Sequence, residues 1–198
     1  AIIPVWAFKN WHYFNLNTVL LYPHSFNDSL EYKEQNSTIT GMVGNGALFG
    51  KMLLSKPALH LGFSNSRDKQ NVGIHEFVHL IDMMDGDCDG FPEKLVEFAY
   101  SIPWLNMIEK KIQEINNNNS NIRDYGATNK VEFFAVASEY FFERPKMLKN
   151  KHPVLYENLQ LIYQQNTAEI SVDVKTRKKD LCPCASGKRY KRCCLPDD

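Results

Sequence analysis

The sequence predicts an α+β fold with a short cysteine-rich module at its C-terminal end. Three short apolar segments, 18–22, 47–54 and 58–63, have the length and composition of β-strands. Segments with helical periodicity follow them, and the most regular cover residues 71–82 and 130–142. Four of the five cysteines crowd into the last part of the chain. We therefore expect a small sheet and several helices in one domain, followed by a separate module.

Length, charge and cysteine placement narrow the class of protein. A chain of 198 residues has room for one substantial domain, which we place at 1–164, a polar linker at 165–180 and a module at 181–198. The formal net charge is zero, so no overall field favours nucleic acid or an anionic membrane. No apolar run approaches the roughly 20 residues that span a bilayer. Clustered thiols suit a metal in a reducing compartment, so we expect a cytoplasmic protein.

The helix predicted at 71–82 carries the pattern H-E-x-x-H. His75 and His79 are four residues apart, so both imidazoles leave one face of the helix, as two ligands of one metal ion must. Glu76 stands beside them, where a carboxylate can take a proton from a water molecule held by the metal. Asp82 falls on the same stripe and is a candidate to accept a hydrogen bond from a histidine N–H.

An alternative is a helix that carries two histidines by chance. The residues between and after them are largely apolar, which indicates a buried helix. Paired histidines in such a helix would need other partners for their polar atoms if no metal were bound. The context therefore favours a zinc site.

The helix predicted at 130–142 is the best source of a third ligand. Its aromatic residues bury most of its surface, yet Glu132 and Glu139 lie on one shared stripe. Carboxylates that face a core are costly unless they are paired or bound to a metal. The spacing does not choose between the two glutamates. Thr128 or Asn129 can cap the start of this helix.

Other segments carry weaker signals. We expect the strand at 18–22 to be buried, and the strand at 58–63 to form a sheet edge that pairs with extended substrate, although it could equally be a strand without that role. The acidic loop at 85–90 imitates the start of a calcium loop but lacks the required glutamate, so we expect no calcium there. Further helices are expected where periodicity continues, at 93–100, 104–115 and 154–164, with a turn around Pro145.

Several motifs in one order resemble the Mlc titration factor A family, zinc peptidases whose catalytic domain is similar to that of anthrax lethal factor. The resemblance covers roughly residues 17–164. It rests on the strand and proline at 19–23, the H-E-x-x-H segment with Asp82, the Gly-Phe-Pro turn at 90–92, and Asp124-Tyr125 followed by the helix at 131–142. The segment before the first strand looks shorter here than in that family.

The resemblance implies a fold and a set of roles. The fold is a zincin-like metallopeptidase domain of the gluzincin type, with a small mixed sheet and an active-site helix. Glu132 would be the third zinc ligand, Glu76 the general base and Tyr125 the phenol that faces the substrate carbonyl. Glu139 would then support the site through a histidine or pack against the core. For Tyr125 the alternative is a buried aromatic side chain in the loop before the helix.

The C-terminal tail resembles the SEC-C zinc module. Four thiolates would form a structural zinc site with no open position, and the basic residues between them would offset its negative charge. In related proteins this module docks to a chaperone or the ribosome, which suggests recruitment of a partner. A redox cluster is the alternative, and the basic run at 175–179 could touch RNA weakly. The four cysteines are Cys182, Cys184, Cys193 and Cys194.

Together these features predict a zinc-dependent peptidase with one catalytic and one structural Zn²⁺. Its partners would be a peptide or protein substrate and a protein recruited by the tail, with no membrane and no nucleic acid expected. One alternative is a regulatory binding protein that sequesters a transcriptional repressor. Another is an adaptor for a chaperone or ribosome with little catalysis.

Overall fold

The chain divides into two compact units, Ala1–Ala168 and Glu169–Asp198. The structure is a computed structural model that describes residues 3–8, 11–34, 36–44, 46–65, 68–93, 95, 101–169, 179, 189 and 192. The first unit contains a short 3-10 helix, η1 (Ile3–Val5), a three-stranded sheet and six α-helices among these residues. The predicted α+β class is therefore confirmed.

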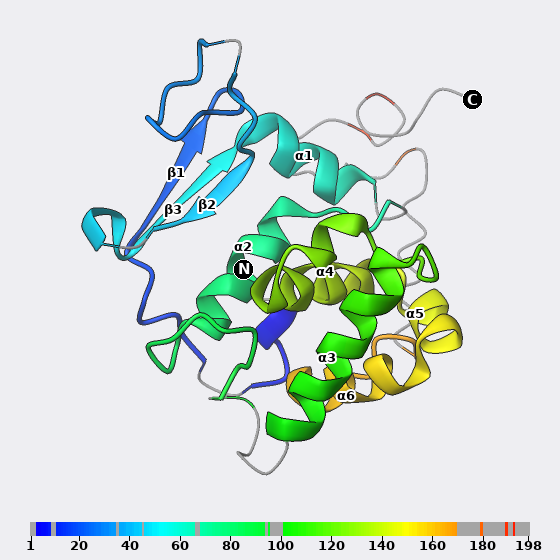
Figure 1. Ribbon diagram of the computed structural model, residues 1–198. Helices are drawn as coiled ribbons and strands as arrows, with labels where there is room; N and C mark the ends of the chain where they lie inside the picture. Colours follow the sequence, from blue (N-terminus) through cyan, green and yellow to red (C-terminus); the bar gives the residue numbers. More distant parts are fainter. Residues whose placement is uncertain are drawn as a thin grey trace. The chain divides into compact units, whose positions relative to one another are not determined.

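The sheet is small and mixed. Its order is β1 (Thr18–Tyr22), β3 (Lys51–Ser55) and β2 (Gly41–Val43). β1 runs parallel to the central strand β3, and β2 runs antiparallel to it. Strand β3 is almost fully buried, as its apolar residues require. Among the described residues, the two edge strands β1 and β2 each pair only with β3 (Figure 1).

Two strand predictions need correction. The strand at 18–22 is present but is not buried, because β1 is an edge strand and its first four residues are exposed. The segment 47–54 begins as a 3-10 helix, η2 (Gly46–Leu48), and only its later part joins β3. An apolar run predicts a strand well but does not distinguish the centre of a sheet from its edge.

The predicted strand at 58–63 is wrong, because this segment is helical. Helix α1 (Lys56–Ser64) starts directly after β3, with Ser55 as its N-cap and Pro57 in its first turn. The Ser55 hydroxyl accepts a hydrogen bond from the Ala58 N–H at 3.5 Å. A helix has no free strand edge, so this segment cannot pair with an extended peptide as expected.

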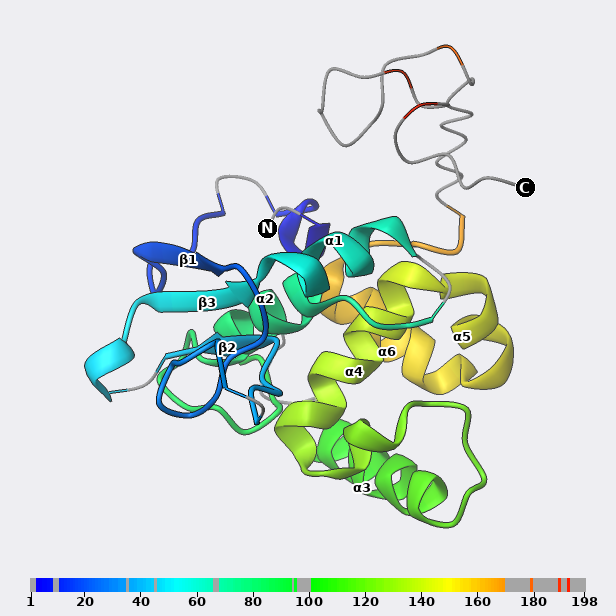
Figure 2. The same ribbon diagram turned by 90° about the horizontal axis from the view of Figure 1, so that it is seen from above.

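Helix α2 (Val72–Asp82) holds the H-E-x-x-H segment between the two layers of the unit. Asn71 caps it, accepting a hydrogen bond from the Ile74 N–H at 3.1 Å through its side chain. On one side α2 packs against the sheet, and on the other against α4 (Lys130–Glu143). In both views it lies between the sheet and the remaining helices (Figure 1, Figure 2).

The remaining helices agree with the predicted ones, with one addition. The predictions at 104–115, 130–142 and 154–164 are confirmed, and most of the segment 93–100 lies outside the described residues. The turn expected around Pro145 is a helix instead, because proline suits the first turn of a helix. These elements are α3 (Ser101–Asn116), the 3-10 helix η4 (Asp124–Ala127), α4, α5 (Pro145–Lys151) and α6 (Pro153–Tyr163).

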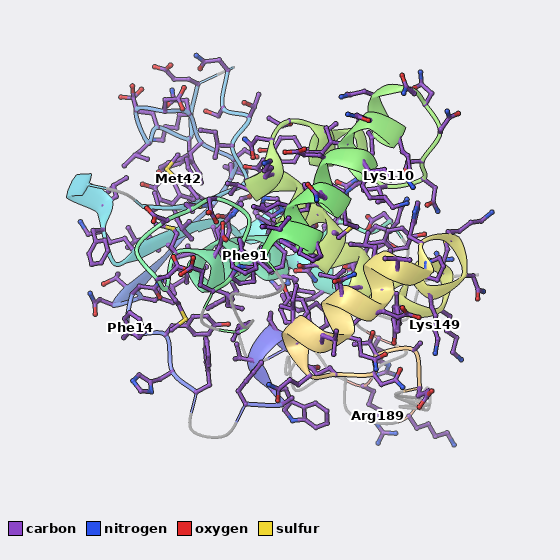
Figure 3. The ribbon with its side chains drawn as sticks, turned by 60° about the horizontal axis from the view of Figure 1, so that its bottom comes forward. Phe14, Met42, Phe91, Lys110, Lys149 and Arg189 are labelled. Carbon is purple, nitrogen blue, oxygen red and sulfur yellow. The ribbon has the colours of Figure 1, made fainter. Side chains whose placement is uncertain are left out.

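Two apolar clusters fix α2 in place. The larger gathers α2, α3, α4 and α6 around aromatic side chains such as Trp104, Phe134 and Tyr163. The smaller lies between β3 and α2 and contains Met52 and Phe77. Side chains labelled in Figure 3 mark the two sides of the unit: Phe14 and Met42 on the sheet side, Lys110 and Lys149 on the helical side. With both flanks packed, the polar stripe of α2 faces a cavity, together with Val72 at the start of the helix.

Two further features concern the loops. Residues 165–168, which composition assigns to the linker, pack on the first unit: Gln165 donates to the carbonyl of Ile3, and Thr167 to that of Phe141. In the acidic loop, Asp85 and Asp89 accept hydrogen bonds from the loop's own N–H groups. Among the described residues, no helix has the length and apolar character needed to cross a membrane.

Candidate metal centre

Three of the predicted ligands come together from two helices. His75 and His79 project from α2, and Glu132 projects from the first turn of α4. Glu132 Oε2 lies 3.1 Å from His75 Nε2 and 3.7 Å from His79 Nε2. Potential ligand atoms of the three residues all lie within 4.8 Å of one another. Their side chains are only 10–17% exposed, so the group sits in a largely dry setting.

Local structure explains this arrangement. The two histidines are one helical turn apart, and their rings lie 4.6 Å apart between centroids at 85° to each other. Glu132 is held at the start of α4 because the Asn129 side chain accepts a hydrogen bond from the Glu132 N–H at 2.9 Å. Packing of α2 against α4 then brings the carboxylate over the histidine face.

The hydrogen bonds around His75 test whether a cation fits. Glu139 Oε1 lies 2.8 Å from His75 Nδ1, which places the proton of the neutral ring on Nδ1 and leaves a lone pair on Nε2. That lone pair faces Glu132 Oε2, which is buried and has no hydrogen-bond donor among the described residues. Converging lone pairs from two imidazoles and one carboxylate match the donor set of a tetrahedral Zn²⁺ site with an open fourth position.

The same space attracts protons. Burial lowers the pKa of His75, but the carboxylates of Glu132 and Glu139 beside its two ring nitrogens outweigh burial and raise the pKa to about 10. For His79, burial and then the neighbouring His75 charge lower the pKa to about 4. A metal cation that occupies the group must therefore displace a proton from His75.

Glu76 is buried beside the three candidate ligands. Burial raises its pKa to about 7, while a backbone hydrogen bond from Val43 of β2 opposes the shift. Gly41, also in β2, makes room for this carboxylate: a Cβ at Gly41 would lie 2.5 Å from Glu76 Oε1. A carboxyl group whose pKa lies near neutrality can both accept and return a proton at physiological pH.

Tyr125 stands at the mouth of the site. It lies in η4, its ring is 6.0 Å from that of His75, and it is 52% exposed. Burial of part of the ring and then the Glu132 carboxylate raise the pKa of its phenol, which therefore stays protonated. The exposure of Tyr125 speaks against the alternative of a buried aromatic side chain.

The two glutamates that the spacing left equivalent occupy different places. Glu139 lies behind His75, is buried, and receives hydrogen bonds from His75, from the Arg123 guanidinium and from the Asn71 N–H. Glu132 alone of the two belongs to the group that could hold a metal. The fold thus separates a carboxylate that could bind a cation from one that orients a candidate ligand.

Asp82 is directed elsewhere. It accepts hydrogen bonds from the Gly90 N–H at 3.0 Å and from the Cys88 thiol at 3.5 Å, instead of from either histidine as expected. Although Asp82 shares the stripe of His79, it stands at the last turn of α2, where the following loop closes over it. Its second oxygen is buried without a partner among the described residues.

Sequence reasoning missed Arg123, Asn71 and Gly41. Asn71 could have been found as an N-cap, because its residue type and place before the apolar helix are typical of one. Arg123 and Gly41 carry no local signal, since each acts on a residue far away in the chain. The predicted zinc-binding cysteines lie outside the described residues.

Comparison with known proteins places this chain in a family. The model of the glucose-regulated metallo-peptidase M90 family matches residues 1–164. The chain belongs to the M90 family. A second model, that of the SEC-C motif, matches residues 179–196, which include all four clustered cysteines. Both resemblances expected from the sequence are thereby confirmed.

Curated relatives of this M90 protein are similar over half or more of its length. An uncharacterized protein, slr2042, from Synechocystis sp. is 32% identical over 163 residues, which cover 76% of this chain and 58% of the relative. Mlc titration factor A from Serratia proteamaculans is 28% identical over 166 residues, covering 76% and 60%. Mlc titration factor A from Salmonella arizonae is 32% identical over 107 residues, covering 50% and 42%. The chain spans less than two thirds of the length of these relatives.

Proposed function

We propose that this M90 protein is a zinc-dependent peptidase of the gluzincin type that hydrolyses peptide bonds. One observation carries the proposal: the buried Glu132 Oε2 has no hydrogen-bond donor among the described residues and faces the Nε2 atoms of both histidines. Such an arrangement is costly unless a proton on His75 or a metal ion lies between the three atoms, and the convergence of two imidazoles and one carboxylate on one point favours the metal ion. Membership of a metallo-peptidase family supports the same conclusion.

Each residue around the candidate metal has a separate role in hydrolysis. Zn²⁺, when bound, would supply Lewis acidity to a water and to the substrate carbonyl. Glu76 takes a proton from the attacking water and returns it to the leaving amine nitrogen. The phenol of Tyr125 donates a hydrogen bond to the carbonyl oxygen as negative charge grows there. Glu139 keeps the His75 ring in the tautomer that leaves Nε2 free for the metal.

Strand β2 is the edge on which we propose that substrate lies. Among the described residues it pairs only with β3, so apart from the Val43 N–H, which donates to Glu76, the backbone groups on its other side remain for an extended peptide. A cavity of about 240 Å³ runs along this strand to the three candidate metal ligands. β2 thus replaces the segment 58–63 as the proposed substrate edge.

Glu76→Gln tests the proposal directly. The variant should bind zinc like the parent, since Gln removes only the proton-accepting group, and hydrolysis of a chromogenic peptide should fall by about 100-fold or more. Glu157→Gln makes the same chemical change on an exposed face of α6 and should leave turnover unchanged. Hydrolysis at the parental rate by Glu76→Gln would remove Glu76 from the mechanism.

A second candidate is a binding function. Relatives of the chain carry the name Mlc titration factor A, which describes the titration of Mlc and not a reaction. In this case the three candidate ligands and their metal ion would stabilise a docking surface, and a transcriptional regulator would be the partner. Binding of such a partner should survive Glu76→Gln, whereas peptide hydrolysis should not.

The C-terminal motif completes the proposal. Its four cysteines would hold a structural Zn²⁺, and the motif would recruit a protein partner such as a chaperone or the ribosome. We place the whole protein in the cytoplasm, where clustered thiols stay reduced.

A further inference from the structure

A cavity of about 520 Å³ opens beside the candidate metal group at the start of α2. Residues of five segments line it: the stretch before β2, helix α1, the start of α2, the start of η4 with Arg123 and Tyr125, and Glu139 of α4. His75 and Glu76 form its wall toward the metal group. Its volume is enough for one or two residues of a bound peptide.

We propose that this cavity is a subsite for a carboxylate group of the substrate, and that Arg123 binds it. The inference rests on the proposed peptidase function and names the class of substrate: peptides that carry a carboxylate next to the bond cleaved. The carboxylate can belong to an acidic side chain or to the C-terminus of the peptide, because both present the same two oxygens to a guanidinium.

Arg123 has donors to spare. Its Nη2 donates to Glu139 Oε1, which is its only acidic partner among the described residues. Its Nε also lacks a hydrogen-bond partner in the same part of the chain, but it is buried, so a ligand in the cavity would meet the Nη atoms. The side chain is 21% exposed, so the guanidinium is largely removed from water but still reaches the cavity. A guanidinium with unpaired donors in a partly dry site favours a planar anion that accepts two hydrogen bonds.

The surrounding charges leave that preference intact. Glu139 already receives hydrogen bonds from His75, Arg123 and the Asn71 N–H, so its charge is compensated within the wall. Lys69 adds positive charge nearby: burial lowers its pKa first, and the charge of Arg123 lowers it further. Glu76 is the other acidic residue of the lining, and it faces the metal group.

Apolar residues complete the subsite. Ile39 and Leu61 line the same cavity as Arg123, from the stretch before β2 and from α1. They suit the methylene groups of a glutamate side chain or the last residue of a peptide, while Arg123 takes the carboxylate. Tyr125 lies between this subsite and the candidate metal, because it lines both cavities.

Matched peptides test the subsite. Internally quenched peptides are compared in pairs that differ only by Glu against Gln, placed in turn on either side of the cleaved bond, and by a free against an amidated C-terminus. In at least one pair, the parent should cleave the acidic peptide with a kcat/KM about 10-fold or more above that of the neutral peptide. This factor corresponds to the free energy of one hydrogen bond to a charged group. The arm that shows the preference identifies the source of the carboxylate.

Variants decide whether Arg123 is responsible. In Arg123→Gln the acid-to-neutral ratio should fall close to one. Lys110→Gln, which removes the same charge from an exposed position on α3, should keep the parental ratio (Figure 3). Because each ratio is taken within one variant, a general loss of turnover cancels. If Arg123→Gln does not fold, Arg123→Lys replaces it. A lysine ammonium that pairs with Glu139 has no second planar pair of N–H donors to offer a substrate carboxylate, so the acid-to-neutral ratio should again fall.

A binding measurement separates this inference from the peptidase proposal. Fluorescent acid and neutral peptides are titrated into zinc-loaded Glu76→Gln, with and without Arg123→Gln, and dissociation constants are read by anisotropy. A 10-fold preference for the acid that depends on Arg123 supports the subsite even if the parent hydrolyses nothing. Equal affinities together with equal kcat/KM values, or a preference that persists in Arg123→Gln, would overturn it.

Discussion

The buried carboxyl group of Asp82 lowers the stability of the folded chain when it ionises, and the candidate site does not explain why it is there. Burial raises the pKa of this carboxyl to about 7, although hydrogen bonds from Gly90 and Cys88 work in the opposite direction. One of its oxygens is buried and unpaired among the described residues. The folded chain therefore binds a proton at Asp82 more tightly than the unfolded chain does, and loses stability as pH rises from about 4 through 7.

Asp82→Asn should remove this pH dependence. Below pH 4 both side chains are neutral, so the variant and the parent should differ little in free energy of unfolding. As pH rises to 8, the parent must ionise a buried acid, and the variant should gain on it by about 2–4 kcal/mol. Urea denaturation at pH values from 4 to 8 measures the difference. A difference independent of pH would show that Asp82 titrates normally.

At the same scale, the sequence predicts the part of the site that is local. His75, Glu76 and His79 follow from spacing along one helix, because a helical turn fixes which side chains share a face. Spacing cannot rank Glu132 against Glu139, since both lie on one stripe of α4. The packing of α2 on α4 decides between them. Arg123 has no pattern at all, because its partner lies 16 residues away on another element.

Among the elements, β2 is small but sets the position of the proposed base. Gly41 lies against Glu76 and Val72, and a Cβ there would come within 2.5 Å of an atom of each. Contacts this short force a neighbour to move. Glu76 lines the cavities beside Gly41, so its side chain can move toward that space.

Gly41→Ala should therefore impair catalysis through geometry. We expect kcat for peptide hydrolysis to fall by about 100-fold, since a displacement of about 1 Å can cost that much. Zinc content, measured by elemental analysis, should stay at the parental level because Gly41 touches no candidate ligand. An unchanged kcat would mean that Glu76 has room to shift without loss of function.

Helix boundaries show where sequence patterns reach their limit. In α1 the apolar alternation favours a strand, yet Ser55 and Pro57 together form a helix start, and that local signal wins over the alternation. The same holds for α5, where Pro145 begins a helix instead of a turn. The long helices α3, α4 and α6 were predictable because their periodicity extends over three or more turns.

For the whole molecule, the two units and the two family matches predict two separate metal sites. Elemental analysis of the full chain should find two zinc ions. Substituting Cys184 and Cys193 by Ser should leave one zinc and spare peptide hydrolysis, whereas His79→Ala should also leave one zinc but abolish hydrolysis. A single zinc in the parent would contradict the prediction.

The second unit also permits a test of recruitment. Deleting residues 169–198 follows the boundary between the compact units. The shortened chain should keep peptidase activity and lose any protein that co-purifies through the cysteine motif. Partners retained by the shortened chain would assign recruitment to the first unit instead.

Glu139 ties two properties of the protein to one atom. Its Oε1 accepts hydrogen bonds from the ring of a candidate metal ligand and from the guanidinium that faces the large cavity. A laboratory search for altered selectivity at Arg123 would therefore change cofactor retention in the same step. Variants with a new substrate preference should be recovered most readily when selection is carried out in excess zinc, because excess zinc compensates for a lower zinc affinity.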